Sequence, residues 1–253
     1  MIKQINLFIL SLFLITQVVQ GREVAVQKKV ALCITATGKY IDYAISLIES
    51  GKKNFLLNHS VTYFVFTDSP KESSLDTKFI YQKRLGWPHD TLMRFKIYLD
   101  HQSLFEGYDF VYAIDADMKF VSAIGDEILG DLVGTLHPGY YGKRGTYEYK
   151  RYSTAYVREH EGVNYFAGAF YGGKTNHFIN LLTTNVGRIN KDLKKRYIAL
   201  WHDESHLNRY FIDFPPSKIL NPGFCHPEGQ SSNFEIKILA LNKNHSDMRF
   251  CEK

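Results

Sequence analysis

The chain has 253 residues, of which 45% are hydrophobic and 23% are charged, so its composition is that of an ordinary globular protein rather than a disordered or fibrous one. A chain of this length is expected to bury one sizeable core in one compact domain. The net charge of +5 favours anionic ligands, but Lys and Arg are spread along the chain, which argues against a nucleic-acid-binding groove.

The first 27 residues differ from the rest of the chain. Lys3 precedes an apolar run over residues 5–15, and Gly21 is a small residue near a possible cleavage point. This pattern predicts a cleaved signal peptide, or else a short signal anchor, although the run is short for a membrane span; a buried first strand is the third interpretation. We therefore expect a secretory or membrane-associated protein, Golgi-like in a eukaryote and exported or envelope-associated in a bacterium, with residues 28–253 as its folded domain.

The three cysteines do not have the spacing of a zinc or redox motif. Cys33 lies in an apolar stretch and is expected to be buried and unreactive. Cys225 and Cys251 would be able to pair in an oxidising compartment, although nothing in the sequence requires it.

The N-terminal half alternates predicted strands and helices. Residues 29–37 (KVALCITAT) form an apolar run that predicts a strand covered on both faces. Apolar residues at helical spacing follow from about Tyr40 to Phe55, and two more strands are predicted at residues 61–67 and 78–82. This order predicts an α/β domain with a largely parallel sheet.

Two carboxylates follow the next predicted strand. After a helix that opens at residues 87–90, the apolar run 110–114 predicts an interior strand that stops at Asp115 and Asp117. Strand geometry places both carboxylates on one side, where they repel each other unless a proton or a cation offsets their charge. A hard divalent cation suits such oxygen ligands; the alternative is a polar turn capped by the two Asp side chains.

The second half begins with residues 134–173, whose glycine and aromatic content predicts a long irregular surface or lid. Helices are expected over residues 175–190 and 201–211, with Asp203 as the N-cap of the second. Glu204 shares a helical face with Asn208 and Phe211, so it is expected to face the interior; the alternative is an exposed Glu that stabilises the helix dipole. A strand-like run over residues 235–241 follows.

Four segments occur in a fixed order along the chain: D-A-D at residues 115–117, L-H-P-G-Y-Y-G at 136–142, Y-F-A-G-A-F-Y-G-G at 165–173 and W-H-D-E-S-H-L-N-R-Y at 201–210. Together they closely resemble the retaining α-1,3-glycosyltransferase family that includes the histo-blood-group A and B transferases and α-1,3-galactosyltransferase. The resemblance covers residues 30–249, and the fourth segment is its most diagnostic part.

This resemblance implies a GT-A fold, a single α/β domain with a Rossmann-like nucleotide-binding N-terminal half and a mixed central sheet. It implies a hexosyltransferase that moves galactose or N-acetylgalactosamine from a UDP-sugar to the 3-hydroxyl of a galactose-terminated glycan or glycolipid, plain or fucosylated, with retention. Asp115, Asp117 and the donor diphosphate would hold Mn²⁺. Some bacterial relatives have Asn in place of both Asp and need no metal, so the two Asp residues here predict metal dependence.

The resemblance also assigns site residues to three groups. Those matched to the nucleotide are Thr35, Ala36, Thr37, Tyr40, Asp115, Asp117, Lys243 and Arg249. Those matched to the donor sugar are Arg94, Ala167, Gly168, Ala169, His202 and Asp203, and those on the acceptor side are His137, Thr146, Trp201 and Glu204. Without the resemblance, residues 35–40 are equally well explained as core and turn, Lys243 and Arg249 as surface charge, Trp201 as core, and Arg94 as the ion-pair partner of Asp115.

Glu204 matches the proposed nucleophile or base of the family. Retention requires either a covalent glycosyl–enzyme intermediate, with Glu204 as nucleophile, or front-face attack through an ion pair, in which Glu204 stabilises the oxocarbenium-like state. For the donor, the Ala169 methyl takes the space that an acetamido group needs, whereas Ala167 opens room, so UDP-galactose is only slightly favoured.

Two other classes of protein stay open as alternatives. A carbohydrate- or nucleotide-sugar-binding protein would keep the fold without turnover, and a secreted hydrolase would use Asp115 and Glu204 as a carboxylate pair. The presence of Asp115, Asp117 and Glu204 together argues against the first, and the D-x-D spacing argues against the second.

Overall fold

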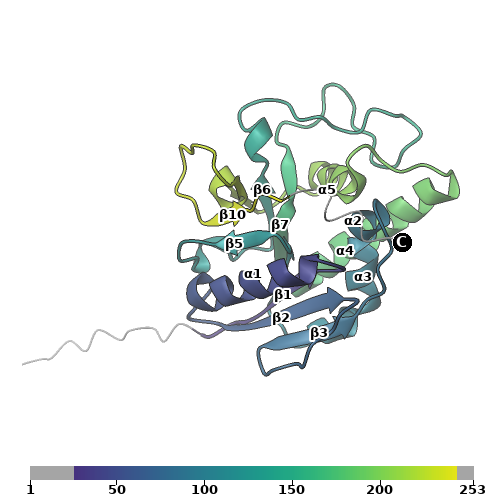
Figure 1. Ribbon diagram of the computed structural model, residues 1–253. Helices are drawn as coiled ribbons and strands as arrows, with labels where there is room; N and C mark the ends of the chain where they lie inside the picture. Colours follow the sequence, from purple (N-terminus) through teal and green to yellow (C-terminus); the bar gives the residue numbers. More distant parts are fainter. Residues whose placement is uncertain (1–25, 244–253) are drawn as a thin grey trace, which may run out of the picture.

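The computed structural model describes residues 26–243, which contain two β-sheets (Figure 1). The strands are β1 (Lys29–Thr35), β2 (Ser60–Thr67), β3 (Thr77–Tyr81), β4 (Phe110–Asp115), β5 (Met118–Phe120), β6 (Leu132–Leu136), β7 (Phe166–Lys174), β8 (Lys218–Leu220), β9 (His226–Pro227) and β10 (Ile238–Ala240). The larger sheet has the order β3-β2-β1-β4-β7-β6-β8, and the smaller sheet has the order β5-β10-β9.

The α-helices of the described residues are α1 (Tyr40–Asn54), α2 (His89–Leu92), α3 (Arg94–Asp100), α4 (Thr175–Lys194) and α5 (His202–Asp213). Short 3-10 helices lie at η1 (Gln102–Phe105), η2 (Asp126–Ile128), η3 (Pro138–Tyr140) and η4 (Pro222–Phe224). No helix in the part of the chain between residues 26 and 243 is long and apolar enough to cross a membrane. The predictions for the N-terminal segment, Arg249 and Cys251 lie outside the described residues.

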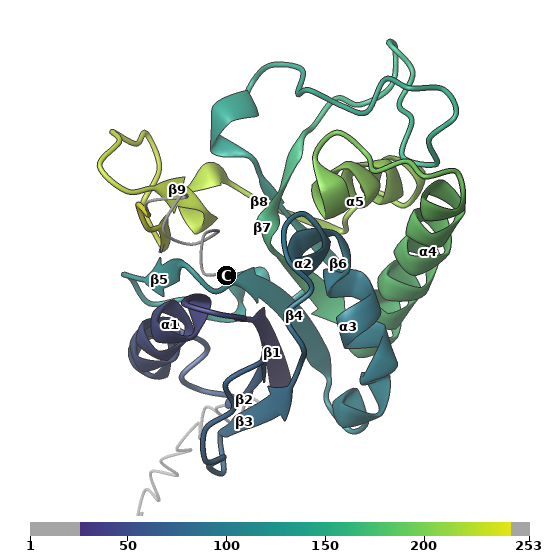
Figure 2. The same cartoon turned by 45° about the vertical axis from the view of Figure 1, so that its right-hand side comes forward.

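The central sheet is covered by helices on both faces, because its strands are apolar on both sides. Along β1, Val30, Leu32 and Ile34 pack in a core with α1, whereas Ala31 and Cys33 pack in a core with α3 and α4. Figure 2 shows α1 on one side of the sheet and α3, α4 and α5 on the other. The predicted burial of Cys33 is confirmed.

The carboxyl ends of β1 and β4 meet at the middle of the sheet. β3, β2, β1 and β4 are parallel, whereas β7 is antiparallel to both of its neighbours. Because β1 pairs with β2 on one side and β4 on the other, the topological switch point lies between β1 and β4, where open α/β sheets bind nucleotides. Thr35 and Asp115, the last residues of the two strands, are register partners.

The prediction of an irregular segment over residues 134–173 was wrong at both ends. The segment begins within β6 and ends in β7, which lies between β4 and β6 in the sheet. β7 contains three glycines and few β-branched residues, so it lacks the usual sequence pattern of a strand. Its glycines are explained by packing instead: a Cβ at Gly172 would lie 2.4 Å from the carbonyl oxygen of Val111.

Several other boundaries differ from the predictions. The helix expected after residue 87 is divided into α2 and α3 at Met93, and the helix expected over residues 175–190 extends to Lys194. The strand expected over residues 235–241 is only three residues long, as β10, and β1 ends at Thr35. The α/β class and the mixed central sheet are confirmed.

Gly172→Ala is expected to lower the free energy of unfolding by about 2 kcal/mol or more, because the new methyl group would overlap the backbone of β4. Gly187→Ala is the matched control, since Gly187 is exposed on α4 and a Cβ added there would have nothing within 4 Å. That variant should gain up to about 1 kcal/mol from helix propensity. Urea unfolding measures both changes, and an unchanged midpoint for Gly172→Ala would contradict the close packing of β7.

Candidate active site

Residues from the ends of β1 and β4 form the first part of the site. Asp115 ends β4 opposite Thr35, and Asp117 follows after one residue. Ala36 and Thr37 continue β1 as buried residues, and Tyr40 begins α1 beside them. The fold therefore brings the predicted nucleotide-binding residues of these two segments to one edge of the sheet.

The segment after β10 brings a cation to this edge. Lys243 forms an ion pair with Asp117, and its Nζ lies 5.0 Å from the centroid of the Tyr40 ring. The N–H of Leu241 donates to the carbonyl oxygen of Asp117 at 2.9 Å, which fixes the path of this segment. Although burial lowers the pKa of Lys243, the Asp117 carboxylate holds it above the ordinary value.

Arg94 connects this edge with the start of α5. It forms an ion pair with Asp115, and its Nε and Nη2 lie 2.9 Å and 2.6 Å from Oδ2 of Asp203. Burial raises the pKa of Asp203 to about 6, while the Arg94 charge opposes that rise. The prediction of Asp203 as the N-cap was wrong: Trp201 is the N-cap, and Asp203 lies in the first turn with its carboxylate on Arg94.

Asp203 keeps one carboxylate oxygen unused. Its Oδ1 is buried and has no hydrogen-bond partner within residues 26–243. A buried acceptor without a partner is costly, and a ligand hydroxyl would satisfy it. This unpartnered acceptor belongs to the residue that precedes Glu204 in the first turn of α5.

Glu204 faces the interior, as predicted, and is held by two hydrogen bonds. The Tyr165 hydroxyl donates to Oε1 at 2.9 Å, and the N–H of Gly168 donates to Oε2 at 2.8 Å. Removal of the carboxylate from water raises the pKa of Glu204 to about 7, because the two hydrogen bonds only partly offset that cost. The group is therefore balanced between its neutral and charged forms near neutral pH.

Asn208 holds α5 against β7. Its side chain accepts from the N–H of Phe166 at 2.8 Å and donates to the carbonyl oxygen of Phe166 at 2.8 Å. Neither Asn208 nor Tyr165 was predicted as a site residue. The sequence held one signal for each, since Asn208 shares the helical face of Glu204 and Tyr165 begins the Y-F-A-G-A segment.

The predicted donor-sugar residues lie where these groups meet. A Cβ at Gly168 would be 3.4 Å from Nη2 of Arg94 and 3.5 Å from Cβ of Glu204, so Gly168 separates the two side chains. Ala167 is buried and Ala169 is half-buried on either side of it. His202 has φ +50°, an unusual backbone conformation for a residue other than glycine, and its ring packs edge-on against Trp87.

His137 and Thr146, two of the predicted acceptor residues, form a second group, which is connected to Glu204 through Tyr140 and Tyr165. The ring centroid of His137 lies 5.8 Å from that of Tyr165, and Oγ1 of Thr146 lies 2.8 Å from the Tyr140 hydroxyl. The Tyr140 and Tyr165 ring centroids are 4.8 Å apart. Burial lowers the pKa of His137. Trp201 is 45% exposed, so the side chain is not part of the core.

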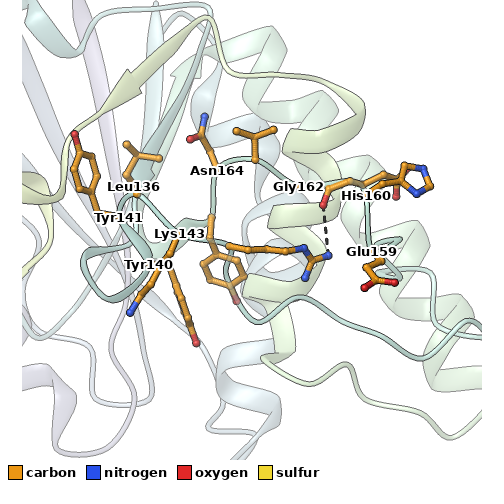
Figure 3. Close-up of a pocket in the computed structure, with 13 residues that line it drawn as sticks. Leu136, Tyr140, Tyr141, Lys143, Glu159, His160, Gly162 and Asn164 are labelled. Carbon is orange, nitrogen blue, oxygen red and sulfur yellow. Dashed lines mark hydrogen bonds between the residues drawn. The ribbon is translucent and has the colours of Figure 1, made fainter.

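A hollow of about 630 Å³ opens beside these aromatic residues (Figure 3). Tyr140 and Tyr165 belong to its lining, and Leu136 and Tyr141 lie at the end opposite Glu159 and His160. Apolar rings and polar side chains together are typical of carbohydrate-binding surfaces.

Asp115 and Asp117 fit a divalent cation by their chemistry. Each ion pair uses one carboxylate oxygen, Oδ1 of Asp115 for Arg94 and Oδ2 of Asp117 for Lys243, so further oxygen lone pairs stay available for a hard metal ion. Burial and the neighbouring Asp115 charge raise the pKa of Asp117. Within residues 26–243 no group of three or more His, Cys, Asp or Glu side chains is arranged to hold a metal.

The structure thus brings together most of the predicted site. Thr35, Asp115, Asp117 and Lys243 meet at one edge of the sheet, while Arg94 and Gly168 connect that edge to Glu204. The acceptor group follows on the far side of Tyr165.

Comparison with known proteins gives a family match over nearly the whole chain. The family model described as "Glycosyltransferase family 6" matches residues 16–250, a range that includes every site residue named above.

Three curated relatives show the extent of the similarity. Histo-blood group ABO system transferase 1 of Rattus norvegicus is 31% identical over 237 residues, which cover 87% of this chain and 68% of the relative. Globoside alpha-1,3-N-acetylgalactosaminyltransferase 1 of Canis lupus familiaris is 31% identical over 226 residues, 84% of this chain and 65% of the relative. O-antigen biosynthesis glycosyltransferase WbnI of Escherichia coli is 29% identical over 215 residues, 82% of this chain and 92% of the relative.

Glu204→Gln is expected to stabilise the protein above neutral pH. Because the pKa of Glu204 is raised to about 7, the unfolded chain loses its proton first as the pH rises, and the free energy of unfolding falls between the two pKa values. Gln stays neutral. Its amide oxygen would accept from the N–H of Gly168, and its amide N–H would donate to the Tyr165 hydroxyl. The gain should reach up to about 3 kcal/mol at alkaline pH and vanish in acid, as measured by urea unfolding.

Glu159→Gln is the matched control, since Glu159 is exposed and carries the same chemical change. Its stability profile should follow that of the unmodified protein across the pH range. If the Glu204→Gln profile did the same, the raised pKa of Glu204 would be refuted.

Proposed function

This chain belongs to glycosyltransferase family 6, and we propose that it transfers galactose, or N-acetylgalactosamine, from a UDP-sugar in α-1,3 linkage to a galactose-terminated acceptor with retention. The observation that carries this proposal is the arrangement around Gly168. Asp115 at the switch point of the sheet pairs with Arg94, and Gly168 lies between Arg94 and the inward-facing Glu204. The α/β architecture with its mixed sheet agrees with the GT-A fold of the family.

We propose that Asp115 and Asp117 bind Mn²⁺ together with the donor diphosphate. The bound metal would supply a positive charge that stabilises the departing UDP. Lys243 lies at Asp117 and would add a second positive charge on the same side. Thr35, Ala36, Thr37 and Tyr40 would hold the uracil and ribose at the end of β1, as expected for a nucleotide at a switch point.

The donor sugar would lie over Gly168, between Arg94 and Glu204. The Oδ1 of Asp203 has no hydrogen-bond partner within residues 26–243 and would accept from a sugar hydroxyl once the side chains that cover it move aside. Arg94 holds Oδ2 of the same carboxylate from two of its nitrogens, so the direction of that acceptor is fixed before the sugar binds.

Glu204 would act on the anomeric carbon in its charged form. As a nucleophile it would form a bond to that carbon while the bond to UDP breaks and its electron pair leaves with the diphosphate. As an electrostatic group it would stabilise the same carbon during front-face attack by the acceptor. Both roles need the carboxylate, so with a pKa near 7 the reactive form is lost as the pH falls.

The acceptor would approach from the side of His137, Thr146 and Trp201. The galactose that receives the new bond would contact these residues, and the sugars behind it would enter the hollow beside Tyr140. The names of the relatives refer to the histo-blood group ABO system, to globoside and to O-antigen biosynthesis. We therefore expect a glycan or glycolipid acceptor and action in a secretory compartment or at a cell envelope.

Acceptor-dependent release of UDP tests the proposal. With UDP-galactose and plain or fucosylated galactosides, turnover should require Mn²⁺, stop with a strong chelator and resume when Mn²⁺ is restored. Asp117→Asn should lower kcat/KM about 100-fold or more, because a metal ligand is lost. Asp100→Asn is the control, since Asp100 is exposed and pairs with Lys96 on the surface of α3.

The possible outcomes separate the candidate functions. Donor binding without turnover would favour a nucleotide-sugar-binding protein. Full activity in the presence of the chelator would refute the metal proposal but leave the transferase proposal intact.

Ala169→Gly is expected to change donor preference. Ala169 is half-buried beside Gly168, so removal of its methyl group opens room for an acetamido group next to the donor sugar. The ratio of kcat/KM for UDP-N-acetylgalactosamine to that for UDP-galactose should rise about 10-fold. Because the ratio is measured on one protein sample, a general loss of stability cancels, and an unchanged ratio would show that Ala169 does not select the donor.

A further inference from the structure

A second hollow, of about 370 Å³, lies between the loop that joins β6 to β7 and the helices α4 and α5. Figure 2 shows this loop passing over α5 toward α4. None of the predicted donor, metal or acceptor residues that the structure describes lines this hollow. Its charged lining consists of Arg151, Arg158, Arg188, Arg209, Glu161 and Asp213.

The lining has more positive than negative charge. Asp213 pairs with both Arg188 and Arg209, and Oε2 of Glu161 lies 2.8 Å from Nη1 of Arg209. These two carboxylates therefore form ion pairs with two of the four arginines, Arg188 and Arg209. Within the described residues, neither Arg151 nor Arg158 forms a side-chain hydrogen bond or an ion pair, so these two arginines of the lining have no carboxylate partner. The buried Asp192 carboxylate accepts hydrogen bonds from Ser153 and Thr154 of the lining and offsets part of the positive charge.

Arg188 also has an unused donor. Its Nη1 is buried and makes no hydrogen bond to any part of the described chain, although its Nη2 is paired with Asp213. A buried guanidinium nitrogen without an acceptor is costly, and most such groups in folded proteins have a partner. Because this nitrogen is closed to solvent, Arg188 contributes to the hollow its positive charge rather than this donor.

The arrangement of the arginines favours one kind of anion. The guanidinium groups come from three separate elements: the loop over residues 151–158, α4 with Arg188, and α5 with Arg209. Guanidinium groups around an open hollow match a tetrahedral oxyanion, which offers several oxygens in different directions and up to two negative charges. A planar monoanionic carboxylate would use fewer of these donors and offset less of the positive charge.

We propose that this hollow is a binding site for a phosphate group, distinct from the site of sugar transfer. The phosphate oxygens would accept from the guanidinium groups of Arg151 and Arg158, with the positive charges of Arg188 and Arg209 beside them. The group is either free in solution or part of a phospholipid headgroup. The site does not depend on the identity of the donor or the acceptor.

Calorimetric titration of the full chain with inorganic phosphate, against sodium chloride at equal ionic strength, tests the site. Arg188→Gln and Arg158→Gln should each weaken phosphate binding about tenfold or more, because each removes a positive charge from the lining. Lys191→Gln is the control: Lys191 is exposed on the same helix, one turn from Arg188, and should leave binding unchanged. Lys243→Gln is a second control, since Lys243 lies at the proposed donor-diphosphate site. Phosphate binding to the hollow should be unchanged in this variant.

If Arg188→Gln lacks a cooperative unfolding transition and is therefore misfolded, the test rests on Arg158→Gln. Arg158 is exposed, and its hydrogen bonds to Glu161 and Arg144 are made by its backbone N–H and carbonyl oxygen, which the substitution keeps. Phosphate binding that is equal in the unmodified protein, Arg158→Gln and Lys191→Gln would overturn the proposal. So would the absence of any binding beyond the effect of chloride.

Vesicles distinguish the two sources of phosphate. Sedimentation with phosphatidylglycerol vesicles but not with phosphatidylcholine vesicles, lost in Arg158→Gln and kept in Lys191→Gln, would support the site with a phospholipid headgroup as its ligand. Phosphate binding that needs the arginines, with vesicle sedimentation equal in all variants, would support the site with a free phosphate as its ligand.

Discussion

Repulsion among four acidic side chains at one edge of the sheet is the constraint on which this site depends. Asp115 raises the pKa of Asp117, Asp203 and Glu204, although burial is the larger cause for each. Arg94 and Lys243 offset part of this negative charge. The remaining negative charge favours protonation of these carboxylates or the binding of a cation, in keeping with the divalent metal proposed at Asp115 and Asp117.

Hydrogen bonds between α5 and β7 hold these acidic side chains in place. Asn208 bonds both backbone groups of Phe166, and Glu204 receives the N–H of Gly168 two residues later. Gly172 allows β7 to lie against β4, which carries Asp115 at its end. The acidic residues of two distant segments are therefore positioned by one strand, and the glycines of that strand are a structural requirement of the site.

The sequence predicted the parts of the site that local pattern determines. An apolar run that ends at Asp115 and Asp117, and the helical face that turns Glu204 inward, both follow from periodicity over a few residues. β7 was missed because glycine and aromatic residues obscure strand periodicity, and its identity depends on pairing with β4 and β6. The Arg94–Asp203 pair was missed as well, because its partners are 109 residues apart and Asp203 looks like an N-cap when only its neighbours are considered.

Helix α5 shows how function and stability compete in this protein. Asp203, Ser205, His206 and Asn208 are all buried within two turns, where a stable helix would normally present apolar side chains. Asn208 and the half-buried Glu204 have partners on β7, but Oδ1 of Asp203 and Nδ1 of His206 have none among residues 26–243. Since unpaired buried groups destabilise the fold, the helix that carries Glu204 is less stable than one that turned only apolar side chains inward.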